Sequence, residues 1–530
     1  MIVGGGSAGC VLANRLSADG SNRVVLIEAG SRDWSPYIHM PVGLLWLKGK
    51  RWDYPGDPDP SMSGTESTWA GGKVLGGSGS INGMVWVRGN PSEFDEWAEL
   101  GCEGWDYQGV LPYFKRAESF EDGESAYRGG SGPVRTGRQR VSHRLTDAFI
   151  EAGVRAGHTQ NPDYNGERQE GVGYCQANQR RGFRHSMARA HLGPARWRRN
   201  LRVLTGSFAT RILFDGKRAV GVEFERGGRV HQADAAKEVI VSGGSLASPK
   251  LLMLSGVGPS DHLRECGIDV VHDVPGVGQN LRDHLITRLT WTTNVPTLNR
   301  ELNPVGFLKH GADFVLRGRG PAAACVWHAM IFLKLRDGSR YPDICAGFMP
   351  LGHAAPSKRP GGQRPKLSPD NTVSIVMTLL HPRGRGELRL RSSDPAELPS
   401  IRYQMLAHAD DVRDLIAGAR AVQRVFEEEP LHQYVTTQEL PSPDVQTDAE
   451  WEAHFRKATM TGWHAVGTCK MGGADDPEAV LDPQLRVRGV EGLRVVDASI
   501  MPGVTSGNTN APTVMIAEKA ADLINRGGSR

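Results

Sequence analysis

The chain has 530 residues, 39% of them hydrophobic and 23% charged, with a formal net charge of +4 at pH 7. This composition is typical of a globular protein of two domains or one large elaborated domain, and its dispersed charge argues against nucleic-acid binding. No apolar run reaches the roughly 18 residues that span a bilayer. Seven scattered cysteines without a CxxC pair argue against zinc and disulfide frameworks, so we expect a cytoplasmic protein with no metal site.

The first thirty residues have the pattern of a nucleotide-binding βαβ unit. A short apolar strand at residues 2–3 leads into a G-x-G-x-x-G motif at residues 4–9, after which apolar residues recur at helical spacing. A second apolar strand at residues 24–27 ends at Glu28. This order of strand, glycine turn, helix, strand and acid predicts an adenine-dinucleotide site.

Each residue of this motif has a physical task. Gly4 permits the tight turn, Gly6 lets the backbone approach a pyrophosphate, and Gly9 lets helix and strand pack closely. The helix N-terminus then faces the anion, and Glu28 can accept hydrogen bonds from ribose hydroxyls. Ser7 also fits the G-x-S-x-G elbow of hydrolases, but too little chain precedes it to supply an oxyanion hole. The first strand is short, so we expect a weakened edge of the site or a start further upstream.

A second glycine cluster spans residues 71–90, with the sequence GGKVLGGSGSINGMVWVRGN. Its glycines indicate a backbone that wraps closely around a flat or charged group, and its apolar residues would anchor it. Alternating apolar and polar residues at 202–222 predict a β-hairpin that turns at FDGKR. The apolar run 239–241 ends in a glycine turn before a helix, which predicts a further strand of the nucleotide-binding sheet.

Residues 289–456 differ in pattern from the rest of the chain. Short strands such as 373–379 alternate with irregular stretches, among them a proline-rich one at 354–371, and a helix is predicted at 410–426. We expect an antiparallel sheet flanked by helices, suited to a substrate domain. After it, an apolar strand ends at Asp497 and an amphipathic helix follows, so the nucleotide-binding domain should be discontinuous.

Five motifs, in this order, resemble the glucose–methanol–choline (GMC) oxidoreductases, a family that uses FAD. They are VGGGSAGCVLANRLS with VLIEAG, GGKVLGGSGSINGMVWVRGNPSEFDEWA, GGSLASPKLLMLSGVGP, PGVGQNLRDH, and the pair WHAVGTCKMG and VVDASIMPGVTSGNTNAPTVMIAEKAADLI. The resemblance covers essentially the whole chain. The sequence looks most like the bacterial branch of choline and alcohol dehydrogenases. It implies an α/β fold, α+β overall, with a discontinuous Rossmann-like FAD-binding domain and a substrate domain built on an antiparallel sheet.

The implied domain division has five segments. The FAD-binding domain would comprise residues 1–140, 196–288 and 457–530, and the substrate domain residues 141–195 and 289–456. The last FAD-binding segment would also contain the catalytic residues.

The resemblance also implies which residues bind FAD. They are Gly4, Gly6, Ser7, Ala8, Gly9, Glu28, Ala29, Val74, Gly77, Asn82, Gly83, Met84, Val85, Ala209, Trp463, Asp497, Ala498 and Thr513. Some relatives bind the flavin covalently through a histidine in the glycine cluster. Ile81 stands at that position here, so we expect non-covalent FAD.

His464 falls on the family's catalytic histidine, and Asn510 falls on the second catalytic position, which is asparagine in the choline branch. A histidine among small apolar residues is more often a satisfied core residue, but the flavin motifs favour catalysis here. A neutral imidazole can take the hydroxyl proton of an alcohol and remain a stable acid near pH 7. The Asn510 amide can orient the hydroxyl and stabilise a developing alkoxide, while the flavin accepts the hydride.

The expected activity is oxidation of a primary alcohol, a polyol or a choline-like alcohol to the aldehyde or ketone, with electrons passed to a quinone or dye-type acceptor. An oxygen-using alcohol oxidase of the same family and a lyase with non-redox FAD are the alternatives. A flavin protein without enzymatic activity fits less well, because both catalytic positions are occupied. An NAD enzyme would leave the second glycine cluster without a role.

The sequence does not identify the alcohol. A choline site needs an aromatic cage with a carboxylate. Its aromatic candidates are Trp291, Trp327, Phe332 and Trp463, but plain packing is the favoured explanation for each, and no carboxylate partner is assigned. His381, Arg383 and Arg385 are expected to be structural. We expect no nucleic-acid partner, while peripheral contact with the inner membrane and a monomer or homodimer both stay open.

Overall fold

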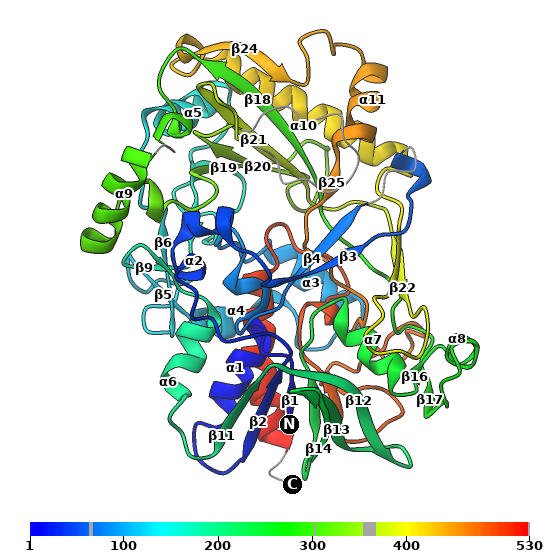
Figure 1. Ribbon diagram of the computed structural model, residues 1–530. Helices are drawn as coiled ribbons and strands as arrows, with labels where there is room; N and C mark the ends of the chain where they lie inside the picture. The colour runs from blue at the N-terminus through cyan, green and yellow to red at the C-terminus, as the bar shows by residue number, and fades with distance from the viewer. Residues whose placement is uncertain (63–66, 302–303, 353–366, 528–530) are drawn as a thin grey trace.

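The computed structural model describes residues 1–62, 67–301, 304–352 and 367–527. Two main sheets organise it, a parallel sheet near the two chain ends and an antiparallel sheet above it in the view of Figure 1. Helices pack on both sheets, so the mixed α/β fold class is as predicted. Most of the proline-rich stretch 354–371 lies outside the described residues.

The parallel sheet has the strand order β11-β2-β1-β15-β26. Its strands are β1 (Ile2–Val3), β2 (Val24–Glu28), β11 (Leu201–Thr205), β15 (Val239–Val241) and β26 (Leu493–Val495). The strands are rich in Val, Ile and Leu, as is usual for parallel strands that are buried on both faces. Although β1 has only two residues, it lies in the middle of the sheet and pairs with β2 on one side and β15 on the other.

One buried carboxylate connects three helices beside the parallel sheet. Helix α1 (Ser7–Leu16) packs on α12 (Asn510–Gly527), which also packs on α4 (Tyr107–Ala117). Glu518 of α12 accepts hydrogen bonds from Arg15 of α1 at 2.8 Å and from Arg116 of α4 at 2.7 Å. The two ends of the chain are therefore held together by charge-assisted bonds as well as by apolar packing.

The β-hairpin predicted at residues 202–222 begins later than expected. β11 joins the parallel sheet beside β2, and the hairpin consists of β12 (Ser207–Asp215) and β13 (Arg218–Arg226). Gly206, with a φ of +65°, separates β11 from β12. The prediction was wrong about residues 202–205 because alternation continues through this glycine, whereas the turn at FDGKR is confirmed.

The antiparallel sheet has the order β24-β18-β21-β20-β19-β7, with β25 paired to β18. Its strands are β7 (Gly171–Tyr174), β18 (Leu285–Thr293), β19 (Ala329–Leu333), β20 (Ile344–Met349), β21 (Thr372–Leu379), β24 (Val435–Leu440) and β25 (Met460–Thr461). Its outer face packs on α5 (Arg144–Arg155) and α10 (Ala409–Glu427), where Phe149 stacks on Phe348 at 4.7 Å. Helix α10 confirms the helix predicted at 410–426.

We call residues 71–90 the glycine loop and the opposite side of the antiparallel sheet its inner face. The loop begins in the last two residues of β4 (Thr68–Gly72) and passes between the two sheets. It ends at Asn90, whose side chain caps α3 (Pro91–Glu99). A Cβ at Gly77 would lie only 2.8 Å from the Cα of Gly6. Because the two glycine motifs approach this closely, residues without side chains are required where they meet.

The remaining elements complete both layers. The helices are α2 (Pro36–His39), α6 (Gly193–Ala195), α7 (Ala247–Leu254), α8 (Ser260–Glu265), α9 (Pro304–Arg317) and α11 (Asp448–Ala458). The strands are β3 (Arg51–Pro55), β5 (Glu118–Phe120), β6 (Val134–Arg138), β8 (Gln176–Ala177), β9 (Gln179–Arg180), β10 (Phe183–Arg184), β14 (Arg229–Asp234), β16 (Val257–Gly258), β17 (His272–Asp273), β22 (Gly386–Arg389) and β23 (Ser400–Tyr403).

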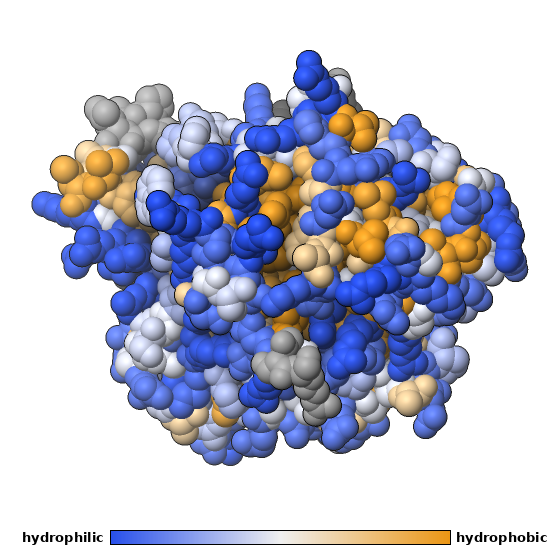
Figure 2. Space-filling view, turned by 90° about the horizontal axis from the view of Figure 1, so that it is seen from below, coloured by the Kyte–Doolittle hydropathy of each residue, from blue (hydrophilic) through white to orange (hydrophobic). Residues whose placement is uncertain are grey.

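Within the described ranges, no helix combines the length and the apolar character needed to cross a bilayer. The face seen in Figure 2 is mainly hydrophilic in its lower half, with hydrophobic side chains gathered in its upper half.

The parallel strands come from four separate parts of the chain. The five-segment domain division stays a prediction.

The end of the glycine loop is anchored by a buried ion cluster, from which a stability prediction follows. Glu118 contacts Arg88 of the loop at 2.5 Å and Arg128 at 2.6 Å. Burial raises the pKa of Glu118, but the two arginines outweigh it and lower that pKa to about 2. Since the folded pKa lies below the ordinary value of 4.5, this contribution to stability is complete above pH 4.5 and is lost as the pH falls toward 2.

We expect Glu118→Gln to lower the free energy of unfolding by about 3–5 kcal/mol. The change leaves the buried guanidinium of Arg88 without its counter-charge and leaves Arg128 paired with Asp163 alone. Urea unfolding at pH 7 measures this loss. The exposed Glu225→Gln serves as the control and should change the free energy by less than about 0.5 kcal/mol. Equal stability of the two variants would contradict the anchoring role.

Candidate functional site

The N-terminus of α1 forms the phosphate end of the predicted cofactor site. Gly4 has a φ of +105°, and a Cβ at Gly9 would lie 1.9 Å from the carbonyl oxygen of Gly4. Gly6 is the N-cap and makes no side-chain cap, while Ser7 and Ala8 begin the helix. The first N–H groups of α1 are thus left for an anion, which fits a pyrophosphate.

Glu28 ends β2 beside this turn and is buried. Its two carboxylate oxygens accept hydrogen bonds from the backbone N–H of Gly5 at 2.7 Å and of Gly30 at 2.6 Å. Burial raises the pKa of Glu28 to about 7. The carboxyl group therefore connects the first glycine motif, through Gly5, to the chain that leaves β2 through Ala29 and Gly30. Its contact with a ribose stays a prediction.

The third part of the predicted cofactor site lies at the end of β26. Asp497 accepts hydrogen bonds from the Ser248 hydroxyl at 2.6 Å and from the Gly244 N–H at 2.9 Å. Ala498 follows in a short helical turn, and Thr513 bonds the Thr509 carbonyl within α12. Asp497 thereby connects two parallel strands at their carboxyl ends, where nucleotide cofactors bind in such sheets. Ala209, by contrast, lies in β12, outside that sheet.

Asn510 lies on the cofactor side of the site. Its side-chain oxygen accepts a hydrogen bond from the Ser7 hydroxyl at 2.7 Å, and its Nδ2 is buried without a partner. A Cβ at Gly79 of the glycine loop would come within 2.6 Å of the same hydroxyl. The Asn510 amide is thus a buried donor beside the N-terminus of α1, and the backbone of Gly79 covers it. This arrangement fits a cofactor that supplies acceptor oxygens.

The glycine loop presents its predicted flavin-lining residues against the inner face. The Asn82 side-chain oxygen accepts from the Met84 N–H at 3.0 Å and from Arg184 at 2.7 Å, and Met84 has a φ of +65°. Met84 and Val85 pack in one apolar cluster with the sheet. Val74 packs in a separate cluster with Ile81, the position at which covalent relatives have a histidine. Non-covalent FAD stays a prediction.

His464 follows β25, and a hydrogen bond from its backbone N–H fixes its position. Its N–H donates to the buried carboxylate of Asp283 at 2.7 Å, and the Thr461 hydroxyl donates to the same carboxylate. Trp463 has a φ of +58°, and its exposed ring donates from Nε1 to the Thr68 carbonyl at 3.0 Å. Asp283 thus holds the backbone of residues 461–464 in the conformation that positions the imidazole.

A chain of hydrogen bonds determines where the protons of two histidines lie. His284 Nε2 lies 2.9 Å from the Thr505 carbonyl oxygen, which can only accept, so this nitrogen is protonated. In a neutral His284, Nδ1 is then an acceptor, and it lies 2.9 Å from Nδ1 of His464, which must donate. His464 Nε2 is therefore the unprotonated nitrogen, and it accepts from the Asn508 amide at 3.0 Å.

Burial keeps both imidazoles neutral. It lowers the pKa of His464 to about 4 and holds the pKa of His284 well below its usual range. His284 is fully buried, whereas the His464 side chain keeps part of its surface accessible. At neutral pH, His464 thus offers a lone pair at Nε2, which is what a general base requires.

The asparagine beside His464 is Asn508, which the sequence analysis missed. The prediction placed Asn510 in this position, but Asn510 begins α12 and bonds Ser7 instead. The sequence Asn-Thr-Asn contains both residues, and spacing alone does not indicate which of them turns toward the histidine. His284 was also missed, although it ends the motif PGVGQNLRDH.

The structure separates the aromatic candidates. Trp291 stacks on Phe426 of α10 at 3.7 Å, so it belongs to the outer face. Trp327 and Phe332 lie in the apolar cluster of the inner face. His381 lies 3.0 Å from the carboxylate of Glu93.

The two arginines that follow His381 differ in their partners. Arg383 forms ion pairs with carboxylates of α10, while Arg385 bonds backbone carbonyls. These contacts agree with a structural role for this segment.

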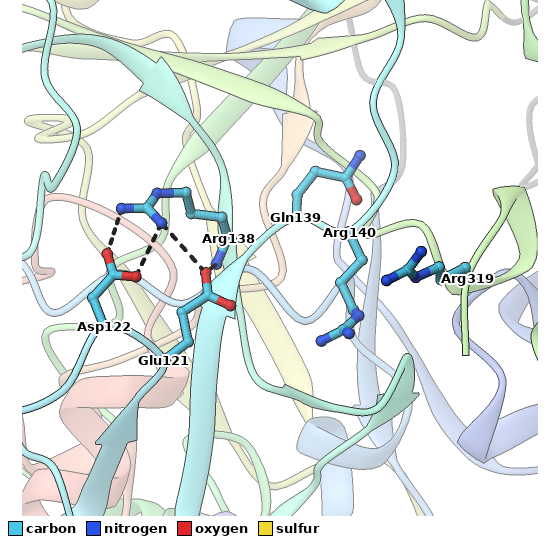
Figure 3. A pocket seen from close by; sticks show the side chains of 6 residues that line it. All are labelled: Glu121, Asp122, Arg138, Gln139, Arg140 and Arg319. Atoms are coloured by element: carbon cyan, nitrogen blue, oxygen red, sulfur yellow. Dashed lines mark hydrogen bonds and ion pairs between the residues drawn. The ribbon is translucent and has the colours of Figure 1, made fainter. Parts of the chain in front are cut away.

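An open hollow of about 500 Å³ lies elsewhere on the surface. It is lined by Arg138, Arg140 and Arg319 among others, and Arg138 is paired with Glu121 and Asp122 (Figure 3). None of the predicted site residues lines it. In the described part of the chain, no group of histidine, cysteine and acidic side chains has the arrangement of a metal site.

Comparison with known proteins agrees with this geometry. Family models for the GMC oxidoreductases match residues 1–286 and 382–517. The chain is 42% identical to an oxygen-dependent choline dehydrogenase of Brucella canis and 43% identical to one of Sinorhizobium medicae, in each case over 99% of this chain and 95% of the relative. The crystal structure of pyridoxine 4-oxidase from Mesorbium loti is similar with a TM-score of 0.88 and 29% identity, covering 99% of this chain and 98% of that one.

The hydrogen-bond chain predicts a role for His284 that can be measured. We expect His284→Ala to lower the rate constant of flavin reduction by an alcohol about 10–100-fold, because the proton on His464 Nδ1 loses its acceptor. His284→Asn, which restores a side-chain acceptor, should recover part of that loss. Stopped-flow absorbance of the FAD-loaded protein checks both. A wild-type rate in His284→Ala at full FAD content would contradict the relay.

Proposed function

The chain belongs to the GMC oxidoreductases, FAD-dependent enzymes that act on the CH–OH group of alcohols, and we propose that it oxidises a primary alcohol at His464 and Asn508. The observation that supports this most directly is the unprotonated Nε2 of His464 facing the Asn508 amide. We assign the second catalytic position to Asn508 rather than to Asn510. The cofactor-binding roles of the glycine motifs, Glu28 and Asp497 are part of the same proposal.

Asn508, His464 and His284 have separate roles in the proposed reaction. The alcohol oxygen replaces the direct hydrogen bond between the Asn508 amide and His464 and lies within reach of both, so that it accepts from the amide and donates its proton to Nε2 of His464. His284 keeps Nδ1 of His464 in a hydrogen bond throughout, which orients the ring before and after it gains the proton. FAD, when bound, supplies the acceptor for the hydride that leaves the alcohol carbon.

We propose a quinone or dye-type compound as the electron acceptor, with oxygen as the alternative. The relatives named oxygen-dependent choline dehydrogenases keep both open for this chain. Release of hydrogen peroxide during turnover in air would favour oxygen. Turnover of substrate without any bleaching of the flavin band would instead indicate a lyase.

Anaerobic flavin reduction tests the central proposal. Primary alcohols of the accepted class should bleach the visible FAD band, and His464→Gln should lower the rate constant about 10²–10⁴-fold with FAD still bound. Because burial lowers the pKa of His464 to about 4, the wild-type rate constant should stay level from pH 8 to pH 5 and fall only as the pH approaches 4. An undiminished rate in His464→Gln would refute its role as the base.

The two asparagines can be separated by matched variants. Asn508→Ala should lower the rate constant of flavin reduction at least tenfold with little change in FAD content, because it removes the donor to the alcohol oxygen. Asn510→Ala should mainly weaken FAD binding, because it removes the bond to Ser7 and the donor beside α1. Rate constants and FAD occupancy measured on both variants check this. The reverse pattern would restore Asn510 as the catalytic residue.

A further inference from the structure

The inner face of the antiparallel sheet contains an arginine that neither the fold nor the mechanism uses. Alternate residues of a strand share one face, so β18 places Ile286 and Arg288 on the same side as His284, which directly precedes it. In the register with β21, Ile286 lies opposite Thr378, and Arg288 lies opposite Val376. Val376 belongs to the apolar cluster that packs on the glycine loop. Arg288 is therefore on the face that looks toward the predicted flavin site.

Arg288 has no partner among the residues that the structure describes. It forms no ion pair or side-chain hydrogen bond there, and its Nε is buried. The hydroxyl of Thr378, its diagonal neighbour across the two strands, is likewise buried without a partner. A guanidinium keeps its charge even where burial lowers its pKa, as it does here. Arg288 as a whole is half-buried, so the end of its guanidinium stays accessible on this face, where a ligand can supply the acceptors that the described residues do not.

The face between the catalytic histidines and Arg288 is apolar. Ile286 and Val376 occupy it, and the ring of Trp327 covers Gly347, where a Cβ would come within 2.2 Å of that ring. His284 and Arg288 are four positions apart in the chain, which places their Cα atoms about 14 Å apart along the strand. The arrangement thus has a proton acceptor at one end, apolar side chains in the middle and a cation at the other end.

We propose that this face binds the far end of the substrate and that the substrate is an alcohol with an anionic group, such as a carboxylate, remote from its hydroxyl. The proposal rests on the proposed function, because it takes His464 as the end that receives the hydroxyl. The carboxylate accepts from the guanidinium of Arg288 and from the Thr378 hydroxyl, and the middle of the molecule lies on Ile286 and Val376.

A quaternary ammonium such as choline does not match these residues. Such a cation needs an aromatic cage together with a carboxylate. Asp283, the acid next to His284, is bonded to Thr461 and to the backbone of His464. Arg288 instead adds a like charge on the face that a choline headgroup would approach, and like charges without screening water repel strongly.

Three alcohols of one chain length test the charge preference on the FAD-loaded protein. They are 6-hydroxyhexanoate, hexan-1-ol and 6-aminohexan-1-ol, with choline as a fourth probe. In anaerobic stopped-flow reduction we expect 6-hydroxyhexanoate to have an apparent Kd about tenfold lower than hexan-1-ol, because a charge-assisted hydrogen bond is added. The two cationic alcohols should bind more weakly still. Tighter binding of choline than of 6-hydroxyhexanoate would overturn the proposal.

Variants at Arg288 make the test specific. Arg288→Gln should bring 6-hydroxyhexanoate and hexan-1-ol to equal Kd values, and Arg288→Glu should reverse the order of the anionic and cationic alcohols. Arg288→Lys, which keeps the charge in case the other variants fold poorly, should retain the preference for the anion. The exposed Arg229→Gln is the matched control and should behave like the wild-type protein. An unchanged preference in Arg288→Gln would also overturn the proposal.

Binding of hexanoate separates this proposal from the proposed function. Hexanoate has no hydroxyl and cannot be oxidised, so its Kd by calorimetry does not depend on turnover. Binding that is lost in Arg288→Gln, together with no flavin reduction by any alcohol, would support the anion site and contradict the proposed function. Flavin reduction by alcohols regardless of charge, together with no binding of hexanoate, would support the function and contradict the anion site.

Discussion

The hydrogen bond from His284 to the carbonyl oxygen of Thr505 determines which nitrogen carries the proton in His464, the proposed base. A carbonyl can only accept, so the proton of His284 is placed on Nε2, and the proton of His464 follows on Nδ1. The nitrogen left free on His464 is the one that meets Asn508. A histidine in an ordinary apolar core would have no such preference between its two nitrogens. The Thr505 carbonyl oxygen acts on His464 through His284, and in this way it determines which nitrogen of His464 is basic.

That arrangement requires both sheets and the glycine loop to be in place. Asp283 and His284 precede β18, His464 follows β25, and the carbonyl of Thr505 belongs to the loop before α12. The glycine loop crosses the N-terminus of α1 and then packs on the inner face, which brings the predicted flavin positions beside the histidines. Burial at this junction lowers the pKa of His464, so the same packing that excludes water also keeps the base unprotonated.

Family membership and substrate are separate properties of this chain. The chain shares the GMC family with relatives that are named for choline, yet its inner face presents an arginine and apolar side chains. Sites within one fold acquire different substrates through a few side chains on the face opposite the cofactor. Register in the antiparallel sheet is what brings Arg288, Val376 and Thr378 together, although they belong to strands about 90 residues apart in the chain.

The sequence by itself determined the α/β fold class and the FAD motifs at residues 4–9 and 71–90, and it singled out His464 as the proposed base. Glycines that permit close backbone approach, and apolar runs at fixed periods, are local signals that need no tertiary contact to be recognised. The tertiary structure alone placed residues 201–205 in the parallel sheet. Apolar and polar residues alternate in the same way in an edge strand and in a hairpin strand, so the sequence pattern does not distinguish the two. It also placed Asn508 beside His464 and Asn510 beside Ser7, and it revealed the positions of His284 and Arg288. Each of these depends on strand register or on the path of one loop, which are set by contacts between residues far apart in the chain.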